Sequence, residues 1–139
     1  MLSALVVLGA LAALSTLPPY VGPPIGLKLD VASNVELVDH VIAGGVVALS
    51  AWGAAFLLRS GRASLDSPVL MGAVGLCVLG AIWQTTTHVP LIFDAGQPQT
   101  PWGTAIFHSA LGPVMTVFSL VLLWRVLGED PADERSARA

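Results

Sequence analysis

Charged residues are scarce in this chain. Only 11% of its 139 residues are Asp, Glu, Lys or Arg, whereas roughly 25% is usual for soluble domains. Hydrophobic residues make up 55% of the chain, and its mean hydropathy is +0.79. A water-soluble domain needs polar side chains over much of its exterior. The composition therefore excludes an ordinary soluble surface and predicts that lipid surrounds the chain.

Basic patches and cysteine clusters are also missing. The net charge is -3, and most charges lie in short connecting segments and in the C-terminal tail, so we expect no nucleic-acid partner. The single cysteine, Cys77, lies within an apolar run, which excludes an internal disulfide and a multi-cysteine metal site. We expect Cys77 to serve packing.

The chain instead has four apolar runs. Each holds about 17 to 27 residues, enough to cross a hydrocarbon core of roughly 30 Å as a helix. We predict an all-α integral membrane four-helix bundle in residues 1–128, with helices at about 1–17, 34–58, 68–88 and 101–127. Residues 129–139 are predicted to form a flexible cytoplasmic tail.

Prolines mark several of these boundaries. Pro18 ends the first run, Pro68 follows a serine at the start of the third, and Pro90 closes the third before a predicted loop at Leu91 to Gln99. A signal peptide is the other interpretation of the first run. Because that run lacks the basic residues with which a signal peptide begins, we interpret it as a spanning helix.

The basic residues predict the orientation. If four helices alternate, all arginines fall on one side of the membrane and Lys28 falls on the other; these arginines are Arg59, Arg62, Arg125, Arg135 and Arg138. Basic residues are enriched on the cytoplasmic side of membrane proteins. We therefore predict a multi-pass protein of the cell inner (plasma) membrane with both termini in the cytoplasm.

Histidines are the candidates for a functional site. His40 and His108 each lie about seven residues into a predicted helix, at roughly 10 Å from its outer end. Axial ligation of a haem requires two histidines at matched depth on different helices of a bundle. Nearby glycines, at positions 44, 45 and 112, are expected to leave space for the macrocycle. The first interpretation of these histidines is thus haem b bound by His40 and His108.

A metal ion without haem is the second interpretation. Glu36 and His40 share a helix face through their i, i+4 spacing, Asp39 lies beside them, and His88 and His108 are expected to converge from neighbouring helices. Imidazole with carboxylate suits zinc, copper or iron. The third interpretation needs no cofactor, because polar groups near the outer interface can bond to loops and water.

Polar residues also precede His88. Gln84 and His88 are i, i+4 neighbours, which predicts a polar face directed into the bundle, whereas the threonines at 85–87 are expected to bond to carbonyls of their own helix. No catalytic triad order, phosphate-binding glycine loop or HExxH pattern occurs, so a hydrolase or kinase has no basis.

These observations lead to one functional hypothesis and one alternative. The hypothesis is a small polytopic membrane protein whose outer-side histidine site binds haem or a transition-metal ion, and which serves electron transfer or a membrane redox complex. The alternative is a cofactor-free accessory or structural subunit of a membrane complex. The expected partners are the lipid bilayer and other membrane subunits or further copies of the chain; enzymatic activity is left open.

Overall fold

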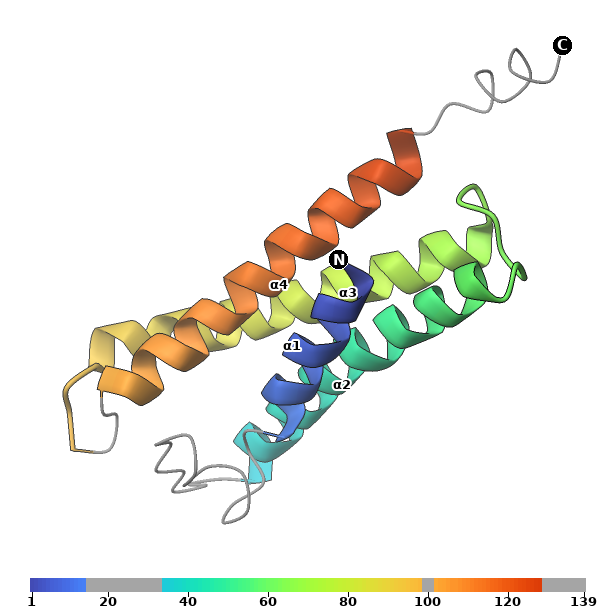
Figure 1. Ribbon diagram of the computed structural model, residues 1–139. Coiled ribbons are helices and arrows are strands. Elements are labelled where there is room, and N and C mark those ends of the chain that lie inside the picture. Colours follow the sequence, from blue (N-terminus) through green and yellow to red (C-terminus); the bar gives the residue numbers. More distant parts are fainter. Residues whose placement is uncertain (15–33, 99–101, 129–139) are drawn as a thin grey trace, which may run out of the picture.

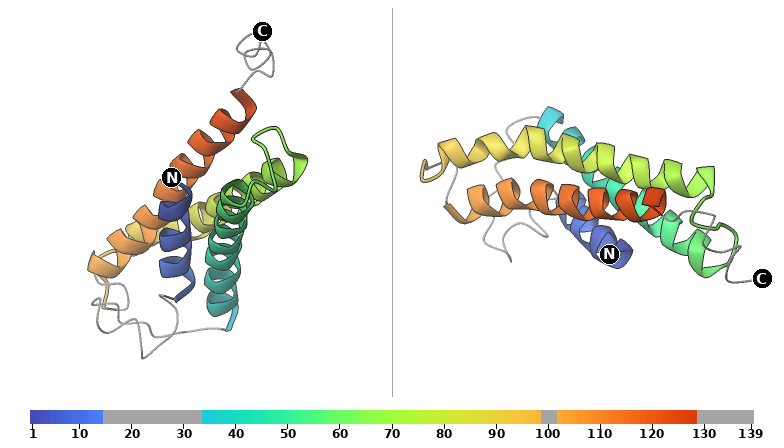
Figure 2. Two further views of the ribbon diagram at one scale, coloured as in Figure 1. Left: turned by 45° about the vertical axis from the view of Figure 1, so that its right-hand side comes forward. Right: turned by 90° about the horizontal axis from the view of Figure 1, so that it is seen from above.

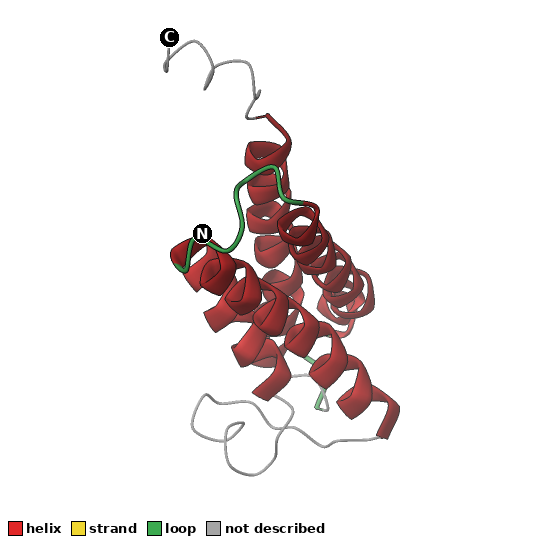
Figure 3. Ribbon diagram, turned by 90° about the vertical axis from the view of Figure 1, so that its right-hand side faces the viewer, coloured by secondary structure: helices red, strands yellow, loops and turns green. Residues whose placement is uncertain are grey.

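The chain folds into helices joined by loops (Figure 1). The computed structural model describes residues 1–14, 34–98 and 102–128, and for residues 34–40 and Thr104 it describes the backbone alone. The helices are α1 (Leu2–Leu14), α2 (Asn34–Arg59), α3 (Pro68–His88), the 3-10 helix η2 (Val89–Asp94) and α4 (Trp102–Gly128). No strand occurs among the described residues (Figure 3). The predicted all-α class is confirmed for this part of the chain.

Three helical segments are long and apolar enough to cross a membrane: Val41–Arg59, Pro68–Asp94 and Ala105–Gly128. α1 is equally apolar but has 13 residues, or about 20 Å of helix, which is shorter than a hydrocarbon core of roughly 30 Å. Residues 15–17, which the predicted first helix includes, lie outside the described residues. Three crossings therefore have structural support, and a fourth stays a prediction.

Each helix packs mainly against its neighbours in the chain. α1 contacts α2, α2 contacts α3, α3 contacts α4, and α4 also contacts α1 (Figures 1 and 2). The largest buried cluster draws on all four helices and contains Leu5, Ala12, Val47, Ala51, Cys77, Ala81, Leu111 and Met115. The Cys77 thiol is fully buried and lies 3.7 Å from the carbonyl oxygen of Val47. The prediction that Cys77 serves packing is confirmed.

The turn between α2 and α3 explains where α2 ends. Gly61 has a φ of 65°, the Arg62 N–H donates to the Leu57 carbonyl at 3.0 Å, and the Gly61 N–H donates to the Leu58 carbonyl at 3.2 Å. This pair of bonds is the Schellman motif, which satisfies the last carbonyls of a helix and favours glycine at the left-handed position. α3 then begins at Pro68, as the Ser67–Pro68 pair predicts.

The arginines of the described residues lie at one end of the molecule. The α2–α3 turn carries Arg59 and Arg62, and the end of α4 carries Arg125; both lie at this end (Figures 1 and 2).

At the other end of the molecule, α3 continues into the 3-10 helix η2, where the sequence predicts a loop. The difference has a local cause, because Pro90 in the first turn of η2 fixes a φ that suits a short 3-10 helix.

α1 and α2 approach each other through small residues. A Cβ added at Gly44 would lie 2.5 Å from the Ala13 nitrogen, and one added at Gly9 would lie 2.7 Å from the Ala48 nitrogen. Between helices surrounded by lipid, such close backbone contact replaces the hydrophobic effect as the source of affinity. The spacing of Gly44 and Ala48 therefore serves contact within the chain.

A glycine pair tests this contact. Gly44→Ala should lower the free energy of unfolding in detergent micelles by about 1–3 kcal/mol, because the added methyl meets backbone that cannot move alone. Gly45→Ala is the matched control, since nothing lies within 4 Å of its Cβ position; its stability should be unchanged or up to about 1 kcal/mol higher. Equal effects of the two substitutions would contradict the α1–α2 contact.

Candidate functional site

Two of the three histidines meet at the α3–α4 interface. His88 is the last residue of α3 and His108 lies in the second turn of α4. Their ring centroids are 6.0 Å apart and their planes differ by 17°. The side chains are 3% and 2% exposed, respectively. Both residues belong to segments that can cross a membrane, so the structure buries an imidazole pair within the apolar part of the chain.

Hydrogen bonds fix the His88 ring. Its Nδ1 lies 3.0 Å from the Gln84 carbonyl oxygen and 2.6 Å from the Thr87 hydroxyl. A carbonyl oxygen only accepts, so Nδ1 carries the proton of the neutral ring and the lone pair lies on Nε2. Histidine ligands of metals commonly have this arrangement, in which the second ring nitrogen donates to a carbonyl.

α4 is tied to the end of α3 beside the pair. The Ser109 hydroxyl donates to the His88 carbonyl at 3.1 Å and lies 3.5 Å from the Val89 carbonyl. The Ser109 hydroxyl therefore ties α4 to the backbone at the point where α3 passes into η2. Phe107 meets the His108 ring edge-on, with centroids 5.5 Å apart.

α3 and α4 bring their backbones into contact one turn deeper. A Cβ added at Gly112 would lie 2.6 Å from the Thr85 nitrogen and 2.9 Å from the Gln84 carbonyl carbon. The Thr85 and Thr116 hydroxyls are 2.9 Å apart, and Thr85 also donates to the Ala81 carbonyl at 2.8 Å. Backbone contact and a hydroxyl pair thus hold the two helices together directly below the histidines.

Two further polar side chains are buried at this interface and along α4. Gln84 and Ser119 are both fully buried, and neither the Gln84 amide nor the Ser119 hydroxyl has a hydrogen-bond partner among the described residues. In an apolar environment an unsatisfied polar group costs about 1–3 kcal/mol. Gln84 lies one turn from His88 on the same face of α3, so the amide and the imidazole pair belong to one polar cluster.

The structure brings together some of the predicted site residues. His88 and His108 converge from neighbouring helices. Glu36, Asp39 and His40 lie in α2 by their backbone, and their side chains lie outside the described residues. Among the side chains that the structure describes, no three His, Cys, Asp or Glu residues form a group that could hold a metal. The described part of the site is therefore a pair of imidazoles.

The space that a haem needs is occupied at two of the three glycines. The Ala13 backbone fills the position beside Gly44, and the Thr85 backbone fills the position beside Gly112, whereas Gly45 has open space. The expectation that Gly44 and Gly112 leave space for a macrocycle is therefore wrong. The physical reason is that each of these glycines permits a neighbouring helix to approach.

Sequence reasoning identified part of the polar cluster and missed the rest. The predicted polar face of α3 is present, and the threonines at 85–87 bond to the carbonyls of Ala81 and Trp83 as expected. Ser109, Thr116 and Ser119 of α4 were not singled out. For Thr116 the sequence holds one indication: it follows His108 by two helical turns and therefore lies on the same face of α4.

Replacing the buried Gln84 amide is expected to stabilise the protein. Gln84→Leu should raise the free energy of unfolding by about 1–3 kcal/mol, because it removes a buried group without a described partner and keeps the volume. Thr85→Val is the contrast, since it breaks the Thr85–Thr116 contact and should lower stability by about 0.6 kcal/mol. Chemical unfolding in micelles measures both; a destabilised Gln84→Leu variant would show that the amide is satisfied in the folded protein.

The interface thus combines two imidazoles, a primary amide and several hydroxyls within apolar surroundings. Chemically, such groups can supply nitrogen ligands to a metal ion or hydrogen bonds to a small polar ligand. Comparisons of the chain with known protein families, with curated proteins and with solved structures found no match.

Proposed function

We propose that this chain is a multi-pass membrane protein that binds a transition-metal ion through His88 and His108. The observation that carries the proposal is the buried imidazole pair at the interface of two membrane-crossing helices. Ionisable side chains are rare within membranes, and those that occur usually serve ion, proton or cofactor sites. A purely structural pair would be replaced at lower cost by apolar side chains.

The distance between the two rings is compatible with one shared ion. With metal–nitrogen bonds of about 2.0–2.1 Å, the ring centres of two imidazoles on one ion lie at most about 6.5 Å apart. The centroid distance of 6.0 Å is within this limit. The bond between His88 Nδ1 and the Gln84 carbonyl supports Nε2 as the ligand nitrogen of His88. Imidazole suits zinc, copper, iron and nickel.

A haem is the less favoured cofactor at this place. The α3 and α4 backbones meet one turn below the pair, at Gly112 and Thr85, and leave no width for a macrocycle between them. A haem held by His40 and His108 would have to lie between α2 and α4, but α2 packs mainly on α1 and α3. The residues that the structure describes therefore support an ion better than a haem.

We further propose that the protein is a four-helix bundle of the inner membrane with both termini in the cytoplasm. Support comes from Arg59, Arg62 and Arg125, which lie at the same end of the molecule (Figure 1). The imidazole pair then lies toward the outer face. At that position a bound redox-active ion would suit electron transfer within a membrane complex, whereas zinc would suit a structural or binding role.

Metal analysis of the purified protein tests the proposal. After incubation with zinc or copper and removal of unbound ions, the wild type should retain about one ion per chain. His88→Ala and His108→Ala should each lose most of it, because one imidazole is a poor site alone. Thr86→Val is the matched control, since Thr86 lies on the exposed side of the same turn and bonds only to its own helix. That variant should keep the ion.

His40→Ala separates the two histidine interpretations. Retention of the ion in this variant is expected if His88 and His108 form the site. Loss in His40→Ala with retention in His88→Ala would contradict the pair as the site. A Soret absorption band in the purified protein would favour haem, and absence of both metal and haem from well-folded protein would favour the cofactor-free accessory subunit.

A further inference from the structure

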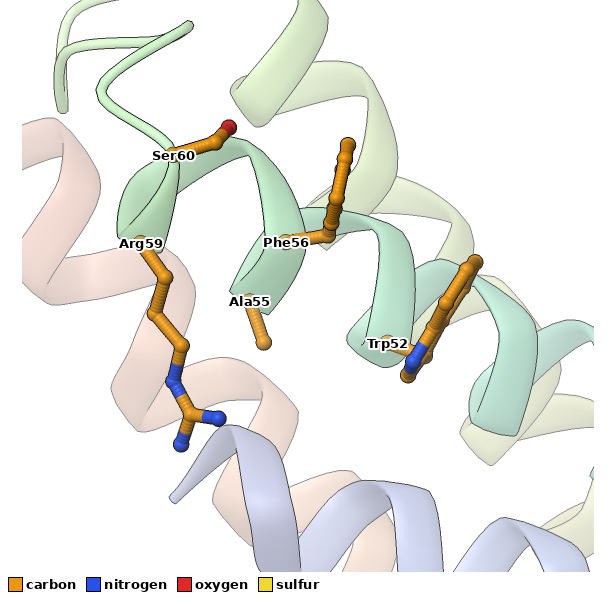
Figure 4. A pocket seen from close by; sticks show the side chains of 5 residues that line it. All are labelled: Trp52, Ala55, Phe56, Arg59 and Ser60. Carbon is orange, nitrogen blue, oxygen red and sulfur yellow. The ribbon is translucent and has the colours of Figure 1, made fainter.

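The end of α2 opposite the histidine site carries a hollow on its exposed face. Five residues line it: Trp52, Ala55, Phe56, Arg59 and Ser60 (Figure 4). They follow one another at the helical spacing i, i+3, i+4, i+7 and i+8, so they form a single stripe along the helix axis. The hollow is apolar toward the middle of the helix and cationic at its end.

Two aromatic rings form the apolar part. Trp52 and Phe56 stack with their ring centroids 6.0 Å apart, and they are 61% and 46% exposed. Ala55, a small residue, also lines the hollow. These residues belong to the segment Val41–Arg59, which is long and apolar enough to cross a membrane. The stripe therefore faces hydrocarbon, and a lipid chain is the natural partner of its rings.

Arg59 forms the cationic part of the hollow, and Arg62 lies beside its Phe56 ring. The Arg59 side chain extends from the last turn of α2 toward α1 (Figure 4), and no carboxylate among the described residues pairs with it. The Arg62 guanidinium carbon lies 5.2 Å from the centre of the Phe56 ring. At the end of a spanning segment both guanidinium groups lie at the depth of lipid head groups, where phosphate is the abundant anion. A guanidinium binds phosphate through two parallel hydrogen bonds.

We propose that this hollow binds an anionic phospholipid. Its phosphate lies at Arg59, Arg62 adds to the positive charge, and one acyl chain follows the stripe formed by Trp52 and Phe56. A lipid fits this hollow because its apolar floor suits an acyl chain and its cationic end suits the head group. This site is independent of the imidazole pair, which lies at the other end of the molecule.

Quenching by brominated lipids tests the site in the full-length protein. The protein is reconstituted into vesicles of equal parts phosphatidylglycerol and phosphatidylcholine, with the bromines on the acyl chains of one lipid or the other. The part of the tryptophan fluorescence that Trp52→Phe removes reports on the hollow. In the wild type, brominated phosphatidylglycerol should quench this part more strongly. Arg59→Gln should lower the preference about fivefold, since each arginine near a membrane surface contributes about that factor.

Arg125→Gln is the matched control, because Arg125 lies in the last turn of α4 at the same end of the molecule. It should leave the preference unchanged, and added inorganic phosphate should not displace the lipid. Equal quenching of Trp52 by the two lipids would overturn the proposal. An equal loss in Arg59→Gln and Arg125→Gln would also overturn it, because the preference would then come from general surface charge. Displacement by inorganic phosphate would point to a free anion instead of a lipid.

Discussion

The close approach of α3 and α4 is the contact on which the candidate site depends. Gly112 has no side chain, so the Thr85 backbone lies where a Cβ would be. With the helices at this distance, the Thr85 and Thr116 hydroxyls meet, and one turn further out the His88 and His108 rings lie 6.0 Å apart. A larger residue at position 112 would separate all of these groups, because helices adjust to a new side chain by moving apart as units.

Lipid surroundings decide how such a contact is stabilised. Apolar side chains gain little by leaving lipid for one another, so small residues and hydroxyl pairs hold the helices together. The same arrangement recurs between α1 and α2, where Gly9 and Gly44 bring the backbones into contact. The imidazole pair and the Gln84 amide differ from these small residues and hydroxyls, because they are larger polar groups. They add polar groups to an interior that is otherwise packed through small and apolar residues, which supports the proposal of a bound ligand.

Sequence reasoning placed the helices well because their ends have local causes. The glycine in the turn after Arg59 and the proline at 68 act within a few residues, and α2 and α3 begin at the predicted positions. The sequence does not show which helices pack against each other. Depth along a helix paired His40 with His108 for a haem, and the metal interpretation expected His88 and His108 to converge. The structure brings His88 and His108 together, and the His40 side chain lies outside the described residues. The sequence predicts that Gly112 leaves space for a cofactor. The backbone of α3 fills this space, and composition and spacing do not indicate which helix is the neighbour.

Solid-state NMR of the protein in lipid bilayers, with carbon-13 and nitrogen-15 in the histidine rings, tests the central pairing most directly. A through-space correlation between the His88 and His108 rings is predicted, because their centroids are 6.0 Å apart. Its loss in His88→Gln, with the His40 signals unchanged, would assign it. A spectrum in which His108 correlates with His40, or with neither ring, would contradict the account.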